Sequence, residues 1–199
     1  MTRWYKEKKK EHFYKKAKKE GFRARSAYKL LQIQKKFRLI HSGDIVVDLG
    51  AAPGGWSQVA HSLVQPNGLV VGVDLSKITS FEDVIFLQGD MTKDETIKSI
   101  LNAVDFEPVS VVLSDMAPDI SGNYSMDHAR SIHLANQALK TAQQVLAKNG
   151  SFVCKVFMGD MIQEFRSNVE ESFQKVKQFS PKASRKSSSE QYIIAQSYK

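Results

Sequence analysis

From Gly43 onward, short apolar runs alternate with longer amphipathic stretches, and this alternation restricts the fold more than any other feature of the sequence. The apolar runs are rich in Val, Ile and Leu, which is typical of strands buried on both faces of a sheet. Five runs of this kind are expected to form strands: Ile45–Leu49, Leu69–Leu75, Val84–Leu87, Ser110–Ser114 and Ser151–Phe157.

The stretches between these runs have the spacing of amphipathic helices. Helices are expected at residues 23–37, 56–64, 92–104, 127–148 and 161–173. Strands that alternate with helices need crossover connections, so the pattern predicts an α/β fold with a mainly parallel sheet between two helical layers.

Two further strand candidates, Lys175–Phe179 and Gln191–Gln196, lie near the end of the sequence. The segment between them is too short for a crossover helix, so we expect them to pair antiparallel. The complete prediction is a seven-stranded sheet with a C-terminal antiparallel hairpin. A length of 199 residues suits one domain, which we expect to span residues 1–199.

Positive charge is concentrated at the start of the chain. Residues 1–38 contain 15 of the 29 Lys and Arg residues and 3 of the 21 Asp and Glu residues, a balance of +12, whereas the remainder carries −4. A basic arm on a nearly neutral body suits a polyanionic partner such as nucleic acid. A solvated terminus that keeps the protein soluble is the alternative, and charge alone leaves both interpretations open.

Several classes of protein are disfavoured by what the sequence lacks. No apolar run approaches the roughly 20 residues that cross a bilayer, and the N-terminus has no apolar core of a secretory signal. The single cysteine, Cys154, cannot form an internal disulfide, and the five histidines are scattered, so no metal site is expected. We therefore expect a cytoplasmic protein without a membrane partner.

The strand at Ile45–Leu49 leads directly into the turn Gly50-Ala51-Ala52-Pro53-Gly54-Gly55-Trp56. Small residues at a strand-to-helix turn allow a ligand to approach the backbone closely. The spacing is neither that of the dinucleotide fingerprint nor that of a P-loop, since no Lys follows the glycines. The turn suits an uncharged nucleoside or amino-acid portion of a ligand, although glycines at such corners are often only architectural.

Carboxylates end four successive strands: Asp48, Asp74, Asp90 and Asp115. The carboxyl ends of parallel strands meet at one edge of the sheet, where such folds bind ligands. Asp74 is placed to bind a ribose diol and Asp90 to accept from an adenine amino group. Asp48 either accepts backbone N–H groups or binds a ligand ammonium through water. A strand-end Asp is often only a helix cap or turn former, but four together favour a site.

Lys155 lies within the apolar run at residues 152–157. A buried lysine is unfavourable unless it is paired or functional, and the alternative is a side chain that snorkels from the sheet edge. Asp115 ends the neighbouring strand, so the two side chains are expected to form a buried pair.

Six segments of the sequence match a known family in its own order and extend over nearly the whole chain. They are KKEGFRARSAYKL at 18–30, VVDLGAAPGGWSQ at 46–58, FLQGD at 86–90, SDMAPDISG at 114–122, GSFVCKVF at 150–157 and SRKSSSEQYIIA at 184–195. On these segments the sequence closely resembles the FtsJ/RrmJ family of ribosomal RNA ribose 2′-O-methyltransferases. It departs from the bacterial members by Asp119 in place of Asn and by three serines before Glu190.

The resemblance implies a Rossmann-like S-adenosylmethionine-dependent methyltransferase fold and a catalytic tetrad of Lys29, Asp115, Lys155 and Glu190. In the implied mechanism Lys155 acts on the 2′-hydroxyl proton, as a base or as an electrostatic stabiliser, while Asp115 and Glu190 orient it. Lys29 positions the ribose or stabilises developing negative charge. The cofactor contacts expected from turn, strand ends and resemblance are Asp48, Gly50, Gly54, Gly55, Trp56, Asp74, Asp90 and Asp115.

The resemblance also implies an RNA substrate, and the chain looks most like members that modify a uridine in large-subunit (23S-type) ribosomal RNA. Phosphates are expected to contact Lys15, Lys16, Lys18, Lys19, Arg23, Arg25, Lys182 and Arg185. Phe13, Tyr14 and Phe22 stack on bases or pack the arm onto the body. Alternatives are methylation of tRNA or an mRNA cap, a non-catalytic RNA-binding ribosome-assembly factor and, disfavoured by the basic arm, a small-molecule methyltransferase. We expect a monomer.

Overall fold

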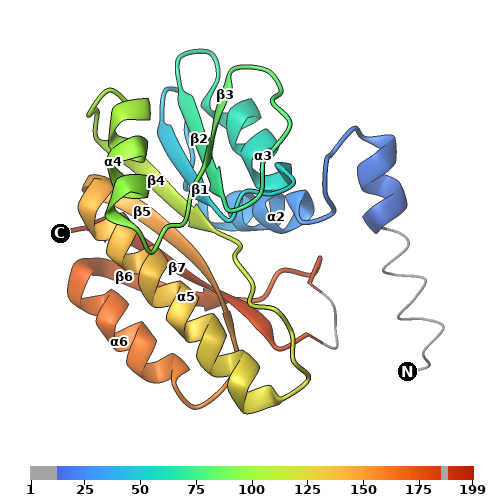
Figure 1. Ribbon diagram of the computed structural model, residues 1–199, viewed down its shortest axis with the longest axis vertical. Coiled ribbons are helices and arrows are strands. Elements are labelled where there is room, and N and C mark those ends of the chain that lie inside the picture. Colours follow the sequence, from blue (N-terminus) through green and yellow to red (C-terminus); the bar gives the residue numbers. More distant parts are fainter. Residues whose placement is uncertain (1–12, 185–187) are drawn as a thin grey trace.

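The computed structural model describes residues 13–184 and 188–199, which form one seven-stranded sheet with helices on both faces (Figure 1). The strand order across the sheet is β3-β2-β1-β4-β5-β7-β6. The strands are β1 (Ile45–Leu49), β2 (Leu69–Asp74), β3 (Val84–Gln88), β4 (Val109–Ser114), β5 (Leu146–Phe157), β6 (Phe173–Phe179) and β7 (Glu190–Tyr198). The predicted α/β fold is confirmed.

The first five strands pair in parallel, whereas β7 pairs antiparallel with both β5 and β6. The predicted antiparallel pair at the end of the chain is therefore present, with β7 inserted between β5 and β6. From β1 the chain moves outward through β2 and β3 and then returns to β4 on the other side of β1. Such a switch point opens a crevice at the carboxyl ends of the strands.

Two helical layers cover the sheet. The helices are α2 (Ala27–Phe37), α3 (Gly55–Val64), α4 (Asp94–Ala103), α5 (Tyr124–Val145) and α6 (Ile162–Ser172). The apolar sides of α2 and α3 pack in one core, and those of α4, α5 and α6 pack in the core on the opposite face. Among the described residues, none of the helices combines the length and the apolar character that a bilayer span requires.

Several boundaries differ from the sequence prediction, among them the start of α2 at Ala27 instead of residue 23 and both ends of α5. Residues 146–148 were predicted to be helical, but α5 ends at Val145 and β5 already begins at Leu146. Leu146 pairs with Val109 ahead of a register shift, so sheet pairing overrides the helical pattern there. At its other end α5 starts three residues before the predicted position, because the side chain of Asn123 accepts a hydrogen bond from the Met126 N–H and caps the helix.

Residues 13–19 form a further helical segment that the sequence analysis did not predict. Phe13 and Phe22 each lie with their rings 5.4 Å from the ring of Tyr28 near the start of α2. This contact favours the packing interpretation of these two aromatics, whereas Tyr14 is 62% exposed. The segment lies at the carboxyl-terminal side of the sheet, beside the loop that precedes β7 (Figure 1).

Candidate active site

The four residues of the expected tetrad form one cluster, although they come from distant parts of the chain. Lys29 lies in α2, Asp115 follows β4, Lys155 lies near the end of β5 and Glu190 begins β7. The ammonium nitrogen of Lys29 lies 2.8 Å from Glu190 Oε1 and 3.7 Å from Asp115 Oδ1. Lys155 Nζ lies 3.1 Å from the same Asp115 oxygen. Two lysines thus face two carboxylates.

The cluster is nearly closed to solvent, since Lys29 is 7% and Lys155 is 8% exposed. Buried charges persist only when they are paired and hydrogen-bonded. Burial alone would raise the pKa of Asp115, but the ammonium groups of Lys155 and Lys29 and a hydrogen bond from the Tyr192 hydroxyl outweigh it and lower the pKa. Asp115 is therefore ionised and holds the two lysines in place.

Lys155 has two acceptors on one residue, because its Nζ donates to the backbone carbonyl of Asp115 as well as contacting the carboxylate. An ammonium group has three N–H donors, so one remains for a substrate oxygen. The Tyr192 hydroxyl donates to Asp115 Oδ1 at 2.6 Å. Burial, followed by the charge of Asp115, raises the pKa of Tyr192, which keeps its hydroxyl neutral.

Sequence analysis missed two supporting residues, Tyr192 and Ser184. The Ser184 hydroxyl donates to Glu190 Oε1 at 2.6 Å and fixes that carboxylate against Lys29. Tyr192 lies two residues after Glu190 in β7 and directly opposite Lys155 in β5. Alternate residues of a strand face the same side of the sheet, so Tyr192 faces the same side as Glu190. This spacing is the sequence signal that could have identified Tyr192.

A cavity of about 380 Å³ opens beside the cluster, at the carboxyl ends of the parallel strands. Asp74, Asp90 and Asp115 all contribute to its wall, together with Gly50. Three of the four strand-end carboxylates predicted to converge therefore do so, and Asp115 borders both the cavity and the lysine cluster. The volume falls within the range of pockets that hold small organic ligands.

Backbone contacts orient both outer carboxylates of the cavity. Asp74 accepts from the N–H groups of Ala52 at 3.0 Å and Ser76 at 2.8 Å. Asp90 accepts from the Thr92 N–H at 2.9 Å and from its hydroxyl at 2.8 Å, and these bonds lower the pKa of Asp90. Each carboxylate keeps lone pairs for hydroxyl or amino donors of a ligand. The donor set of the cavity therefore fits a nucleoside.

Asp48 is completely buried and does not line the cavity. Its Oδ2 accepts from the Ser57 hydroxyl at 2.6 Å, while Oδ1 has no hydrogen-bond partner among the described residues. Burial raises the pKa of Asp48 to about 7, against the opposing effect of Ser57. The charges of Asp115 and Asp74 act in the same direction as burial, so Asp48 lies close to the carboxylates of the cavity.

Gly54, Gly55 and Trp56 also lie away from the cavity wall. An added Cβ at Gly55 would lie 2.9 Å from the Ala24 Cβ, so this glycine allows close packing against the segment before α2. The Trp56 indole N–H donates to the Ser26 carbonyl at 2.9 Å, and its ring lies 5.6 Å from that of Tyr192. Trp56 thus connects the glycine-rich turn with the helix that carries Lys29.

Arg23, expected to contact phosphate, is engaged within the protein. Its guanidinium donates to the carbonyls of Thr79 at 2.6 Å and Pro53 at 3.3 Å, and it lies 4.2 Å from the ring centre of Phe81. Its backbone N–H donates to the Gln58 side chain at 3.0 Å. Arg23 ties the loop after β2 to the glycine-rich turn.

The other expected RNA contacts differ in their surroundings. The exposed lysines Lys15, Lys16, Lys18 and Lys19 follow one another on the N-terminal helical segment, and Lys16 lies 3.7 Å from Glu20. Lys182 is exposed in the loop before β7, Arg25 is half-buried before α2, and Arg185 lies outside the described residues.

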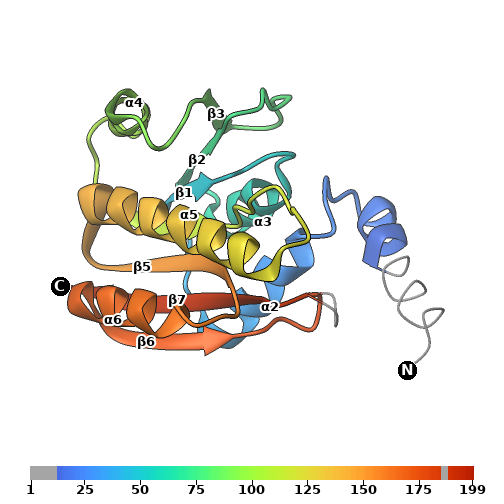
Figure 2. The same cartoon turned by 60° about the horizontal axis from the view of Figure 1, so that its bottom comes forward.

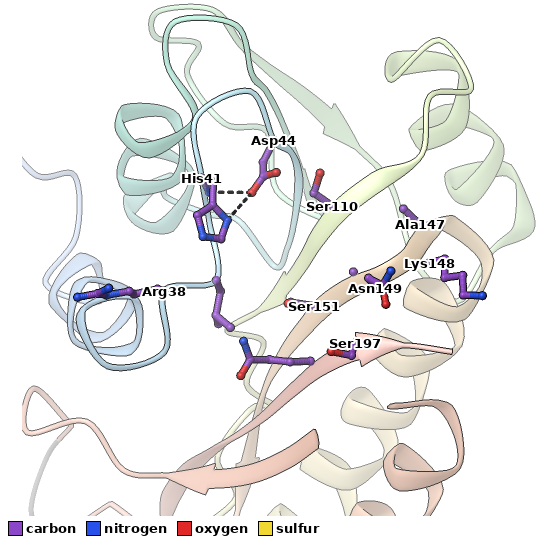
Figure 3. A pocket seen from close by; sticks show the side chains of 12 residues that line it. Arg38, His41, Asp44, Ser110, Ala147, Lys148, Asn149, Ser151 and Ser197 are labelled. Carbon is purple, nitrogen blue, oxygen red and sulfur yellow. Dashed lines mark hydrogen bonds and ion pairs between the residues drawn. The ribbon is translucent and has the colours of Figure 1, made fainter. Parts of the chain in front are cut away.

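A second cavity, of about 340 Å³, lies at the opposite edge of the sheet (Figure 3). Arg38, His41 and Asp44 line it near the start of β1, and Lys148 lines it from the first residues of β5. It includes none of the residues predicted from the sequence to form the site. Within residues 13–184 and 188–199, no group of three or more His, Cys, Asp or Glu side chains is arranged to hold a metal ion.

Fold and site together define a Rossmann-like α/β enzyme with a ligand cleft at the switch point of its sheet. The model of the FtsJ-like methyltransferase family matches residues 22–198, and the chain belongs to this family. The family predicted from the sequence is confirmed, and the protein is a methyltransferase.

Individual relatives agree with this assignment. The chain is 50% identical over 185 residues to a protein of Methanothrix thermoacetophila, covering 93% of this chain and 71% of that protein. It is 49% identical over 196 residues to a protein of Acinetobacter baylyi, covering 98% and 91%. Both relatives are named ribosomal RNA large subunit methyltransferase E.

A solved structure supports the fold. The chain is similar to a Plasmodium falciparum protein described as a ribosomal RNA methyltransferase, with a TM-score of 0.82 and 24% sequence identity. The match covers 89% of this chain and 98% of that one.

Proposed function

We propose that the protein transfers a methyl group from S-adenosylmethionine to a ribose 2′-hydroxyl of RNA, at a uridine of large-subunit ribosomal RNA. The buried cluster of Lys29, Asp115, Lys155 and Glu190 beside a carboxylate-lined cavity carries this proposal. The names of the relatives support the ribosomal substrate.

The cavity has suitable groups for the cofactor. Asp74 binds the ribose hydroxyls, Asp90 accepts from the adenine amino group, and the backbone at Gly50 borders the amino-acid portion. Asp48 is closed to solvent and does not line the cavity, so it makes no direct contact with the cofactor in this proposal. When bound, the cofactor supplies an electrophilic methyl group on a sulfonium. The protein then has to align a hydroxyl oxygen and remove its proton.

Lys155 is the residue best placed to act on the hydroxyl proton. With Nζ held by the carboxylate and carbonyl of Asp115, its remaining donor or lone pair faces the substrate hydroxyl. In the neutral form Lys155 accepts the hydroxyl proton, and in the ammonium form it stabilises the developing alkoxide while the proton leaves to solvent. In either case Lys155 and Asp115 would hold the hydroxyl oxygen in line with the methyl group that a bound cofactor would supply, and the hydroxyl proton would leave to Lys155 or to solvent.

The N-terminal region, residues 1–38, supplies the RNA-binding surface of this proposal. Its balance of +12 favours association with a polyanion through counterion release. The N-terminal helical segment, which carries the exposed lysines at 15, 16, 18 and 19, lies at the same end of the sheet as the loop before β7 (Figure 1). RNA held by these lysines is thus placed at the catalytic cluster.

The substitution Lys155→Ala tests the proposal. We expect it to lower methyl transfer by about 10²–10⁴-fold, because the group that handles the proton is lost. The measurement uses tritiated S-adenosylmethionine, undermethylated large ribosomal subunits and nucleoside analysis for 2′-O-methyluridine. Cofactor affinity, measured by calorimetry, is expected to be unchanged. Lys175→Ala, at an exposed lysine of β6, is the matched control and should methylate normally.

Other outcomes have defined meanings. Full turnover by Lys155→Ala contradicts the catalytic assignment. Label on transfer RNA but not on subunits keeps the chemistry and changes the substrate. A wild-type protein that binds the cofactor but labels no RNA favours the ribosome-assembly factor.

A further inference from the structure

A third cavity, of about 300 Å³, adjoins the catalytic cluster outside the cofactor cleft. The loop before α5 contributes Ile120, α5 contributes its first residue, Tyr124, β5 contributes Phe157, and the loop before β7 contributes Ser188 and Ser189. Both loops lie at the same end of the sheet as the N-terminal helical segment (Figure 2). This cavity has no role in the cofactor contacts described above.

The β5–β7 pairing fixes its position relative to the reacting atoms. Phe157 lies directly opposite Glu190, and Ser189 immediately precedes Glu190. Phe157 lies on the same face of β5 as Lys155, two residues or about 7 Å further along the strand. The cavity is therefore lined by the residue two positions beyond Lys155 on β5 and by the residue that precedes Glu190 of the catalytic cluster.

The wall formed by the loop before α5 is held rigidly. The Asp127 carboxylate accepts from the Ser121 N–H at 2.9 Å, the Ser121 hydroxyl at 2.7 Å and the Gly122 N–H at 3.2 Å. These bonds lower the pKa of Asp127 and occupy its oxygens. Asp127 therefore orders the loop before α5, and the role of its carboxylate is structural.

The side chain of Tyr124 is held in place by a hydrogen bond and is nevertheless exposed to solvent. Its hydroxyl donates to the backbone carbonyl of Met158, yet the residue is 59% exposed, and Ile120 beside the same cavity is 66% exposed. Aromatic rings held open in this way at a nucleic-acid site are suited to stacking on an unpaired base. Ordering the ring before binding reduces the entropy lost when a base stacks on it.

We propose that this cavity binds the base of the target nucleotide, turned out of its stack, with Tyr124 as the stacking surface. The inference rests on the function proposed above and names the recognition element for its substrate. Because Lys155 is only 8% exposed, a ribose that reaches it has to leave the regular helix, and its base needs a new environment. Ser188 and Ser189 also line the cavity, and the Ser188 hydroxyl accepts from the Glu190 N–H at 3.2 Å.

The test compares Tyr124→Ala, Tyr124→Phe and wild type in the subunit methylation assay. Tyr124→Ala is expected to lower kcat/KM for subunits by about tenfold or more, since loss of one base–aromatic stack weakens binding to that extent. Tyr124→Phe keeps the ring and is expected to retain most of the activity. Phe106→Ala, at a 70% exposed aromatic after α4, is the matched control and should behave as wild type.

Two further readouts separate stacking from a folding defect. Cofactor affinity and melting temperature are expected to be the same in Tyr124→Ala and wild type. With 4-thiouridine at the target position, ultraviolet crosslinking is expected to label the peptide that contains Tyr124, and this label should disappear in Tyr124→Ala.

Wild-type kcat/KM in Tyr124→Ala would overturn this inference while leaving the proposed function intact. Equal losses in Tyr124→Ala and Tyr124→Phe would also overturn it, since the hydroxyl contact and not the ring would then matter. Absence of methylation by the wild-type protein would instead reject the proposed function itself.

Discussion

Asp48 is a carboxyl group with no exposed surface and one unpartnered oxygen. Burial raises its pKa to about 7 from an ordinary value of 3.8, which the unfolded chain retains. The folded protein therefore holds this proton more tightly than the unfolded chain. The resulting stabilisation is fully present below pH 3.8 and is lost as the pH rises through about 7.

Asp48→Asn, which resembles the protonated form, should remove this pH dependence. Between pH 4 and pH 7 the free energy of unfolding of the wild type should fall, relative to the variant, by up to about 1.4 kcal/mol per pH unit. Urea unfolding at a series of pH values measures the difference. Asp83→Asn, at an exposed carboxylate, should follow the wild-type curve. Parallel curves for Asp48→Asn and wild type would contradict the raised pKa.

The chemistry of single residues explains which site members the sequence reveals. A lysine in an apolar strand and a carboxylate at a neighbouring strand end are conspicuous, so Lys155 and Asp115 can be predicted without a relative. Lys29 lies among many lysines and Glu190 in a polar loop, and both were predicted only from the family resemblance. Their burial depends on how α2 and β7 meet β5, which local sequence does not encode.

At the scale of elements, Arg23 connects three segments: the start of the chain, the loop after β2 and the glycine-rich turn. Its guanidinium is occupied by backbone carbonyls and the Phe81 ring. Holding these segments together shapes the end of the cofactor cleft that Asp74 lines.

Arg23→Ala is accordingly expected to weaken cofactor binding by up to about tenfold, because losing hydrogen bonds from a charged group loosens the loop and the turn that border Asp74. Calorimetry with S-adenosylmethionine measures this change. The salt dependence of RNA binding should stay the same. A smaller salt slope with unchanged cofactor affinity would instead support the original prediction that Arg23 contacts phosphate.

The elements also differ in how well the sequence predicts them. The five parallel strands overlap the apolar runs that predict them, because buried parallel strands need continuous Val, Ile and Leu. The predicted boundary between α5 and β5 was wrong, because the pairing of Leu146 with Val109 sets this boundary. Val109 is distant from it in the sequence. The helix at residues 13–19 was missed because its lysines conceal the few apolar residues that pack on Tyr28.

At the scale of the whole molecule, charge is divided between a basic arm and a nearly neutral body. Lys18→Gln combined with Lys19→Gln should weaken RNA binding regardless of sequence and reduce the salt slope by about 1 to 2. Filter binding at several salt concentrations measures the slope. Lys98→Gln, at an exposed lysine of α4, is the control. An unchanged slope would place the phosphate contacts elsewhere.

The sheet order has a consequence for biosynthesis. In the sheet, β7 lies between β5 and β6. Strand β6 is therefore synthesised before β7, the strand through which it joins the sheet. Strand β7 supplies Glu190 and Tyr192, so a nascent chain that stops short of β7 lacks the contact of Glu190 with Lys29 and that of Tyr192 with Asp115. A nascent chain is therefore expected to become a competent methyltransferase only after β7 has been made and inserted between β5 and β6.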